Sequence, residues 1–270
     1  MAVPLFKWPG GKRWLAPTLV ELVRTRLGRG STYFEPFAGG AALFFALTPK
    51  RAVLTDINSA LVESYTAVRD APDAVLRALR RIPVNEEEYY RRRAARPRSA
   101  VGRAARLLYL NRTAFAGMYR VNRKGEFNVP YGGGRSHAIL WERDILHIAS
   151  GVLKHTTIAA CDFANTMRRA RDGDVVYCDP TYTTAHNNNG FVRYNECNFS
   201  WHDQHRLAEA AARAAARGAT VIISNAHHKA IATLYPSWQV RIISRLSLIS
   251  PHRTARVPIT EYLIVSPTRR

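Results

Sequence analysis

The sequence predicts an α/β protein built on a doubly wound sheet, with a mainly helical module inserted into it. Apolar segments of strand length alternate with segments of helical periodicity near both ends of the 270-residue chain. Several of these strands run directly into an acidic residue, and the turn after the first strand is rich in glycine. Between residues 62 and 150 the alternation stops, and a largely helical pattern replaces it.

The first part of the chain has the pattern with which such a sheet begins. The expected elements are a helix over 14–27, a strand over 31–34, a helix over 41–47 and a strand over 51–55. The first strand ends at Glu35 and runs into the Gly-rich turn 36–40, and the second ends at Asp56. Strand, Gly-rich turn, helix, strand and acid, in that order, open a doubly wound α/β sheet.

The middle of the chain is expected to form a separate recognition module. It is mostly of helical pattern and contains the arginine-dense run 91–106, which has no acidic residue. A polar, Gly-containing segment from Asn122 to Gly134 has the pattern of a β-hairpin. We therefore assign residues 62–150 to an inserted domain, and 1–61 together with 151–270 to one discontinuous domain.

The alternation returns after the insert. The expected elements are a strand over 157–161, a strand over 174–178, a helix over 202–217, a strand over 220–225 and a last strand over 261–265. The first two of these strands run into Asp162 and Asp179. Ligands of open α/β sheets bind beyond the carboxyl ends of the strands, so these acids, with Glu35 and Asp56, are candidates for a binding site.

The charge of the chain indicates a polyanionic partner. Forty Lys and Arg residues against twenty Asp and Glu residues give a formal net charge of +20 and a pI near 10.6. Such an excess attracts nucleic acids and other anionic surfaces. Arginine, the commoner base here, presents a planar fork to phosphates and guanine edges. A GC-rich genome would account for arginine in place of lysine, but not for twice as many bases as acids.

Three other features narrow the class of protein. No segment approaches the roughly 18 uninterrupted apolar residues of a membrane span, and residues 1–14 lack the apolar core of a signal peptide. The three cysteines have no C-x-x-C spacing, and the adjacent His227 and His228 do not face one metal centre. We therefore expect a cytoplasmic protein with neither a membrane nor a metal among its partners.

The turn after Glu35 allows two kinds of cofactor. Asp56 lies about 20 residues further on, the usual place of a carboxylate that binds ribose hydroxyls, so a dinucleotide site is one interpretation. However, the turn is not G-x-G-x-x-G, and Glu35 would repel a pyrophosphate. A carboxylate there suits a cofactor that carries amino and sulfonium groups. These residues favour S-adenosylmethionine over a dinucleotide.

The tetrapeptide 179–182, DPTY, suggests chemistry on the exocyclic amine of a base. Such an amine is a poor nucleophile, because its lone pair is delocalised into the ring. The Asp179 carboxylate and the Pro180 carbonyl could accept hydrogen bonds from both N–H groups and so return the lone pair to nitrogen. Tyr182 could supply an aromatic face for a base taken out of the duplex. The alternative is an ordinary Asp-Pro turn, since short motifs often match by chance.

Six further segments accompany this one in a fixed order. Together the seven are 6–12 (FKWPGGK), 35–41 (EPFAGGA), 56–58 (DIN), 110–112 (LNR), 125–132 (GEFNVPYG), 177–182 (YCDPTY) and 224–225 (SN). Over nearly its full length the chain resembles the D12-class, Dam-like adenine-N6-specific DNA methyltransferases. The resemblance implies a Rossmann-like methyltransferase sheet that uses S-adenosylmethionine, with an inserted target-recognition domain that contains a β-hairpin.

The resemblance also implies roles for individual residues. The cofactor would be bound by Trp8, Gly11, Lys12, Glu35, Phe37, Gly39, Asp56, Asn58, Asp162, Phe163 and Asp179, with Asp162 on its adenine amine and Asp56 on its ribose. Asp179, Pro180 and Tyr182 would act on the flipped base. Double-stranded DNA would be contacted by Lys7, Arg112, Arg120, Asn122, Lys124 and Asn128. An alternative role for Asn128 is to cap a turn.

The chain departs from the family pattern at three positions. Thr181 replaces a proline, which frees a turn that the family keeps stiff. Ala41 replaces the last glycine of the first turn, which matters only if that position needs a positive φ. Val121 stands in the hairpin where relatives carry an aromatic residue that can wedge into the base stack.

These features predict an enzyme that methylates N6 of adenine in a short duplex site by direct in-line transfer, with base flipping. The hairpin resembles that of enzymes that read GATC, which is therefore the first candidate target. The alternatives are a cytosine-N4 methyltransferase, since that amine poses the same chemical problem, and a DNA-binding homologue without activity. The sequence does not distinguish restriction–modification from a phage or housekeeping role. One copy is generally enough for each transfer, which fits a monomer.

Overall fold

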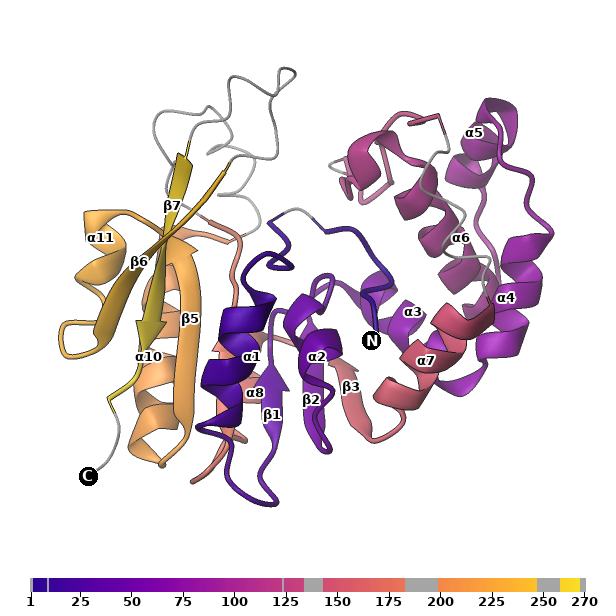
Figure 1. The fold of residues 1–270 in the computed structure, drawn as a ribbon. Helices are drawn as coiled ribbons and strands as arrows, with labels where there is room; N and C mark the ends of the chain where they lie inside the picture. The colour runs from indigo at the N-terminus through magenta and orange to yellow at the C-terminus, as the bar shows by residue number, and fades with distance from the viewer. Residues whose placement is uncertain are drawn as a thin grey trace. The chain divides into compact units, whose positions relative to one another are not determined.

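A computed structural model describes residues 2–8, 10–122, 124–133, 143–182, 199–246 and 258–267 (Figure 1). The helices are α1 (Ala16–Arg24), α2 (Ala42–Leu47), α3 (Ser59–Asp70), α4 (Pro72–Arg80), α5 (Glu86–Ala94), α6 (Ala100–Thr113), the 3-10 helix η1 (Phe115–Gly117), α7 (Arg143–Leu153), α8 (Phe163–Met167), α10 (Trp201–Ala216) and α11 (Lys229–Ala232). The strands are β1 (Tyr33–Glu35), β2 (Ala52–Asp56), β3 (Thr156–Ala160), β4 (Val175–Cys178), β5 (Thr220–Ala226), β6 (Gln239–Leu246) and β7 (Pro258–Val265).

The strands form a seven-stranded, mostly parallel sheet in the order β3-β2-β1-β4-β5-β7-β6. β2 runs parallel to β3, and β4 runs parallel to both β1 and β5. β7 runs antiparallel to β5 on one side and to β6 on the other. A mainly parallel sheet with crossover helices is the doubly wound, Rossmann-like arrangement, so the predicted fold class is confirmed.

The strands that the sequence predicts are all present, and five of them lie within two residues of their expected bounds. β7 begins three residues earlier than expected, and β6 was not predicted. β4 is buried along its whole length, which explains its continuous apolar pattern. β6 has β7 as its only neighbour in the sheet order and carries exposed Arg241 and Ile242 side by side. An edge strand of this kind has no regular alternation of buried and exposed residues, so periodicity does not reveal it.

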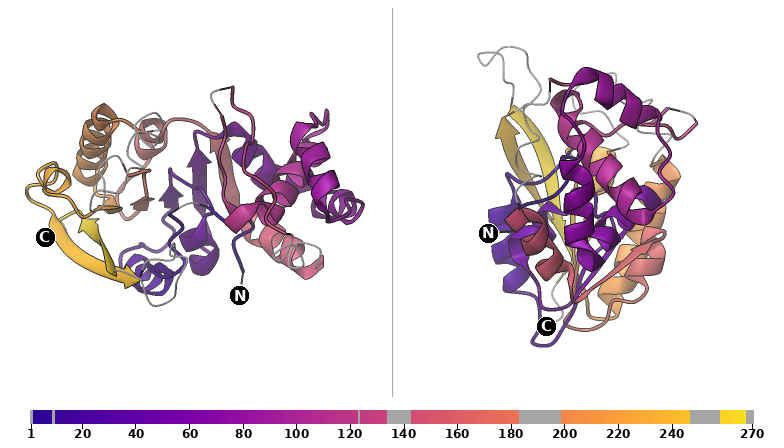
Figure 2. Two further views of the ribbon diagram at one scale, coloured as in Figure 1. Left: turned by 90° about the horizontal axis from the view of Figure 1, so that it is seen from above. Right: turned by 90° about the vertical axis from the view of Figure 1, so that its right-hand side faces the viewer.

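The chain divides into two compact units, Met1–Val20 with Ala38–Ala160 and Glu21–Phe37 with Cys161–Arg270. In the first unit α3 packs against α4, α6 and α7, and both views of Figure 2 show these helices together with α5. In the second unit α10 packs against α8 and β5. The predicted insert, 62–150, lies wholly within the first unit, which also contains β2 and β3; its boundaries stay a prediction.

Polar side chains start several of these helices. Asn58 accepts a hydrogen bond from the backbone of Leu61 at the start of α3, and Asn85 and Ser99 do the same for α5 and α6. At α10, Ser200 and Asp203 form a reciprocal capping box. Each cap satisfies an amide that the helix itself leaves without an acceptor.

Ala41 adopts the left-handed backbone conformation that the sequence left in question. Its φ is 50° and its ψ is 40° at the start of α2, with the methyl group buried. A residue with a Cβ pays about 1–2 kcal/mol for this conformation. The glycine that the family keeps at this position would avoid that cost.

Ala41→Gly is therefore expected to be about 1–2 kcal/mol more stable than the matched variant Ala38→Gly. Ala38 lies in the same turn, is equally buried and is not among the described residues with a positive φ. Both variants lose one buried methyl group and gain the same backbone freedom, but only Ala41→Gly relieves strain. Denaturant unfolding of both proteins measures the difference. Equal free energies of unfolding would show that the turn stores no strain.

Candidate active site and DNA-binding segment

Asp179 follows β4 directly and is held by a chain of hydroxyl groups in the second unit. Its Oδ1 accepts a hydrogen bond of 2.8 Å from Ser224 Oγ on β5. Ser224 Oγ lies 2.9 Å from the hydroxyl of Tyr177, and both of these residues are buried. The carboxylate is thus oriented from behind, while Asp179 itself is only half-buried. Ser224 belongs to one of the seven sequence motifs, but the motif did not indicate this role.

Tyr182 is anchored by a residue that sequence analysis missed. Its hydroxyl donates to Glu261 Oε2 on β7 at 2.9 Å. Burial of this hydroxyl, with the charges of Asp179 and Glu261 near it, raises the pKa of Tyr182 well above its usual value. The phenol therefore keeps its proton and remains a donor. Pro180 is buried and Thr181 is exposed between the two functional side chains.

The second unit also contains four of the predicted cofactor residues besides Asp179. Glu35, at the end of β1, is buried and accepts a hydrogen bond of 2.8 Å from the Tyr33 hydroxyl. The half-buried ring of Phe37 stacks on the buried ring of Phe163, with 5.2 Å between their centroids. Phe199, which was not predicted, lies against both rings.

Asp162 caps α8 and pairs with an arginine. One of its oxygens accepts from the backbone of Ala164, and the other accepts from Arg206 Nη2 at 2.9 Å. The Arg206 guanidinium also lies over the ring of Phe163, 5.0 Å from its centroid. Asp162 is therefore fixed beside the aromatic group, and Arg206 is a further residue that the sequence did not indicate.

In the first unit, Asp56 holds the Gly-rich turn in place. Its Oδ2 accepts from the backbone of Gly39 and its Oδ1 from the backbone of Asn58, each at 2.9 Å. Burial raises the pKa of Asp56, although these hydrogen bonds oppose the shift. A carboxylate has about four acceptor positions, so Asp56 keeps capacity for ribose hydroxyls. Asn58, predicted to bind the cofactor, has its side-chain oxygen in the cap of α3.

The segment 6–12 packs onto the same turn. The ring of Trp8 lies so close to Gly39 that a Cβ there would come within 2.8 Å of Trp8 Cδ1. The ring of Trp8 also stacks on that of Tyr119, with 4.6 Å between centroids. Lys12 is buried and donates to the carbonyl of Gly10, while Gly11 is exposed and donates to the carbonyl of Trp8.

The structure corrects the prediction that Arg112 lies along DNA. Its side chain is buried, and its guanidinium donates to the backbone carbonyls of Leu5 and Pro4. Burial, with the charge of Arg13 nearby, lowers its pKa to about 10. The neighbouring Asn111 binds both the N–H and the carbonyl of Lys7 at 2.8 Å. The motif L-N-R therefore holds the N-terminal segment against α6, and the Arg112 guanidinium contacts backbone carbonyls instead of lying on the surface.

The predicted hairpin is present, with its turn near the start of the expected range. The backbone of Asn128 donates to Arg120 and the backbone of Asn122 donates to Glu126, which closes the turn. Asn122 Oδ1 caps it by accepting from Lys124 and Glu126. Asn122 thus has the turn-capping role that was considered for Asn128, whose side chain instead accepts from Arg120. Gly134 lies outside the described residues.

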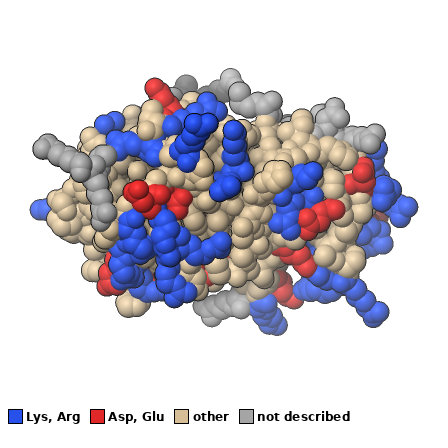
Figure 3. All heavy atoms as spheres, turned by 90° about the horizontal axis from the view of Figure 1, so that it is seen from below, with Lys and Arg blue, Asp and Glu red and all other residues tan. Residues whose placement is uncertain are grey.

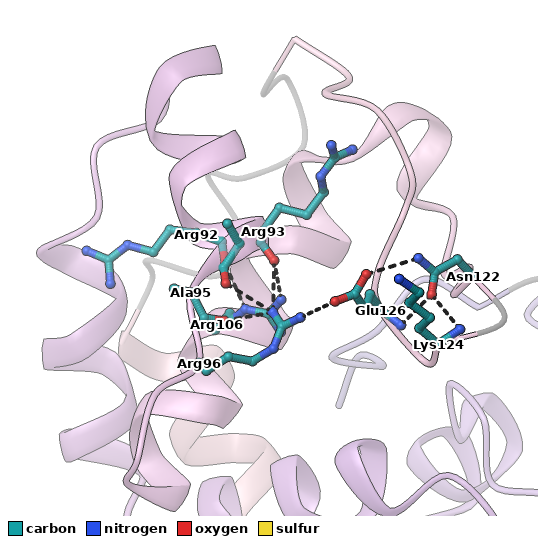
Figure 4. Close-up of polar contacts among 9 residues, drawn as sticks. Arg92, Arg93, Ala95, Arg96, Arg106, Asn122, Lys124 and Glu126 are labelled. Carbon is teal, nitrogen blue, oxygen red and sulfur yellow. Dashed lines mark hydrogen bonds and ion pairs between the residues drawn. The ribbon is translucent and has the colours of Figure 1, made fainter.

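The arginine-dense run ties the hairpin to the helices of the first unit (Figure 4). Arg96 pairs with Glu126 at 2.8 Å, and Glu126 also accepts from the side chain of Asn122. Arg106 donates to the carbonyls of Arg92 and Arg93 at the end of α5. Arg96 therefore links the hairpin to the segment after α5, and Arg106 links α6 to the end of α5 (Figure 4).

The exposed residues of the hairpin leave a basic surface. Arg120 and Lys124 are exposed, and Lys7 and Asn128 are half-buried. Figure 3, which views the molecule from below, shows more blue Lys and Arg groups than red Asp and Glu groups on that face. In the described part of the chain, no cluster of three or more His, Cys, Asp or Glu residues could hold a metal ion. No described helix is both long and apolar enough to span a bilayer.

Comparison with known proteins identifies the family. The D12 class of N6 adenine-specific DNA methyltransferases matches residues 8–249. The type II methyltransferase M1.LlaDCHI of Lactococcus lactis subsp. cremoris is 34% identical over 97% of this chain and 95% of its own length. The DNA adenine methylase of Escherichia coli strain K12 is 31% identical over 98% of this chain and 97% of its own length.

A further relative, the DNA N-6-adenine-methyltransferase of Escherichia phage P1, is 34% identical over 86% of this chain and 31% of its own length. The family match runs through both units and covers the seven segments on which the resemblance was based. Residues 6 and 7, at the start of the segment 6–12, are the exception. The chain belongs to the D12 class of N6 adenine-specific DNA methyltransferases.

Proposed function

We propose that this protein transfers a methyl group from S-adenosylmethionine to N6 of an adenine that has been turned out of double-stranded DNA. The observation that carries the proposal is the arrangement at the end of β4. Asp179 is oriented by Ser224, and the half-buried ring of Tyr182 is fixed by its hydroxyl. A carboxylate held in this way can accept a hydrogen bond from the adenine amine without reorganising during the reaction.

The residues present suit S-adenosylmethionine. The ammonium and sulfonium groups of this cofactor are positive, and the buried Glu35 is a carboxylate of the kind that binds them. The half-buried Asp56 carboxylate would accept hydrogen bonds from the ribose hydroxyls. The stacked rings of Phe37 and Phe163 offer an apolar face to an adenine ring, beside the carboxylate of Asp162. When bound, the cofactor supplies an electrophilic methyl group on a positively charged sulfur.

The protein's own groups would prepare the amine for transfer. The Asp179 carboxylate and the Pro180 carbonyl would accept its two N–H groups, which shifts the lone pair from the ring toward nitrogen. Tyr182 would hold the extruded base by stacking, which offsets part of the few kcal/mol that unstacking costs. The amine would take the methyl group from sulfur directly, which leaves the sulfur as a neutral thioether, and the proton that the amine loses would leave through the Asp179 carboxylate. No covalent protein intermediate is then needed.

We propose GATC as the target sequence, read by the hairpin 120–128. Its exposed Arg120 and Lys124 and its half-buried Asn122 and Asn128 are of the types that bind guanine and adenine edges in the major groove. Val121 has no aromatic ring. We therefore expect this hairpin to insert less strongly into the base stack than the hairpins of relatives with an aromatic residue at this position. Replacing Val121 by Tyr is a direct way to strengthen that contact.

Labelling of DNA tests the proposal. Purified protein is incubated with methyl-labelled S-adenosylmethionine and duplexes that contain GATC or the scrambled site GTAC, and the DNA is digested to nucleosides. Label in N6-methyladenine from GATC alone is the expected result. Label in N4-methylcytosine would keep the chemistry and overturn the substrate. Cofactor binding without label on any DNA would indicate a homologue that binds DNA without modifying it.

A further inference from the structure

Glu261 lies on the strand that reverses the direction of the sheet. β7 is antiparallel to β5, so the start of β7 lies at the carboxyl end of β5, where Glu261 is paired with Ala226. In the same ladder Leu263 is paired with Ser224. Opposed residues share a face of the sheet and side chains alternate along a strand, so Glu261 lies on the face that carries Ser224. The topology therefore brings a carboxylate from late in the chain next to the support of Asp179.

Because Glu261 is buried, its hydrogen bond to Tyr182 is strong and fixes the position of the phenol. Only 1% of Glu261 is exposed. A buried carboxylate is costly unless hydrogen bonds compensate for lost water, and an O–H donor to a carboxylate forms one of the stronger bonds of this kind. The Tyr182 hydroxyl supplies such a bond at 2.9 Å. The phenol is consequently held at one place on the sheet.

Tyr182 has particular need of such an anchor in this chain. Its neighbour Thr181 is exposed and stands where the family keeps a proline, which would fix the backbone φ. With that restraint absent, the ring depends on side-chain contacts for its orientation. A ring that must stack on an extruded base loses much of its effect if it rotates.

We propose that Glu261 is a positioning residue for methyl transfer: it fixes the hydroxyl of Tyr182 so that the ring presents its face to the target base. This inference rests on the proposed role of Tyr182. Glu261 does not touch the reacting atoms. It also completes a row of buried polar groups across the sheet, in which Ser224 orients Asp179 and Glu261 orients Tyr182.

Four variants test the proposal: Glu261→Leu, Glu261→Gln, Tyr182→Phe and the double variant Glu261→Leu with Tyr182→Phe. Glu261→Leu and Tyr182→Phe remove opposite ends of one hydrogen bond, and each is expected to lower kcat about 10- to 100-fold. The KM for S-adenosylmethionine should stay within about twofold, because neither change alters the cofactor residues. Glu261→Gln keeps an acceptor oxygen and should retain most of the activity. The double variant should be no slower than the slower single variant.

A fluorescent base separates positioning from a general loss of structure. 2-Aminopurine replaces the target adenine in the site found by labelling, and its fluorescence rises when it leaves the stack. The rise should be smaller with Glu261→Leu and Tyr182→Phe than with wild type, and unchanged with Glu261→Gln. Glu209→Gln, an exposed glutamate of α10 that pairs with Arg213, is the control. If Glu261→Leu fails to fold, Tyr182→Phe and Glu261→Gln still test the bond.

The outcomes separate this inference from the proposed function. A wild-type protein that labels no adenine overturns the proposed function itself. An active wild type with Tyr182→Phe at full kcat and full fluorescence overturns the positioning role alone. Additive losses in the double variant would likewise overturn it, because they would show that the two residues act through separate contacts.

Discussion

Asp179→Ala is expected to lower kcat for DNA methylation by about 10²- to 10⁴-fold while cofactor binding and folding persist. Asp179, the residue directly after β4, supplies a carboxylate acceptor where positive charge develops on the adenine nitrogen. Its orientation comes from Ser224 and Tyr177, which remain in the variant. Single-turnover methylation of a duplex with one target site measures the loss directly.

Asp172→Ala is the matched control for this variant. Asp172 is an exposed aspartate in the turn before β4, so its replacement should leave the methylation rate within about twofold. Equal melting temperatures for the two variants would show that the loss is chemical. A rate near wild type for Asp179→Ala would rule out a role for this carboxylate in activating the amine. Ser224→Ala should fall between the two, because it loosens Asp179 without removing it.

Arg112→Ala is expected to lower the free energy of unfolding by about 2–4 kcal/mol. The substitution removes a buried side chain and takes the donors away from the carbonyls of Leu5 and Pro4. These carbonyls belong to the N-terminal segment that precedes Trp8 and Lys12, so the affinity for the cofactor should fall as well. Thermal unfolding should shift by roughly 5–10 °C, and cofactor titration reports the second effect.

Arg120→Ala separates a structural arginine from a DNA-binding one. Arg120 is exposed on the hairpin and bonds only within it among the contacts described. Its loss should leave the melting temperature nearly unchanged, weaken DNA binding and make that binding less dependent on salt. The opposite pattern, with Arg112→Ala weakening DNA binding at unchanged stability, would restore the original assignment of Arg112 to the DNA.

Local sequence patterns predict the central strands of this fold well, because those strands are buried on both faces. β4 is an uninterrupted apolar segment for that reason, and β5 is apolar from Val221 to Ile223. The acidic residues at the ends of β1, β2, β3 and β4 mark the carboxyl edge of the sheet. β6 could not be predicted from a local pattern, because it lies at the edge of the sheet and exposes both a polar residue, Arg241, and an apolar one, Ile242. The position of β7 between β5 and β6 is a long-range pairing that no local pattern contains.

The residues of the site divide in the same way. Asp179 and Tyr182 belong to one short motif, so the sequence indicates both of them. Glu261 and Arg206 are brought to their partners only by the sheet and by α10, far away in the sequence. Arg112 was misassigned for a related reason: a motif shows which residue type is present, but not whether its guanidinium meets a phosphate or a backbone carbonyl.

The place of β7 has a consequence for how the protein is made. A ribosome synthesises β5 and β6 before β7, yet in the finished sheet β7 separates them. Until the residues up to Val265 have emerged, β5 lacks its neighbour on one side and β6 has no partner strand at all. The nascent chain also lacks Glu261 during this time. Methylation competence is therefore expected only after β7 has been synthesised, and a chain that lacks β7 is left with open strand edges that invite aggregation.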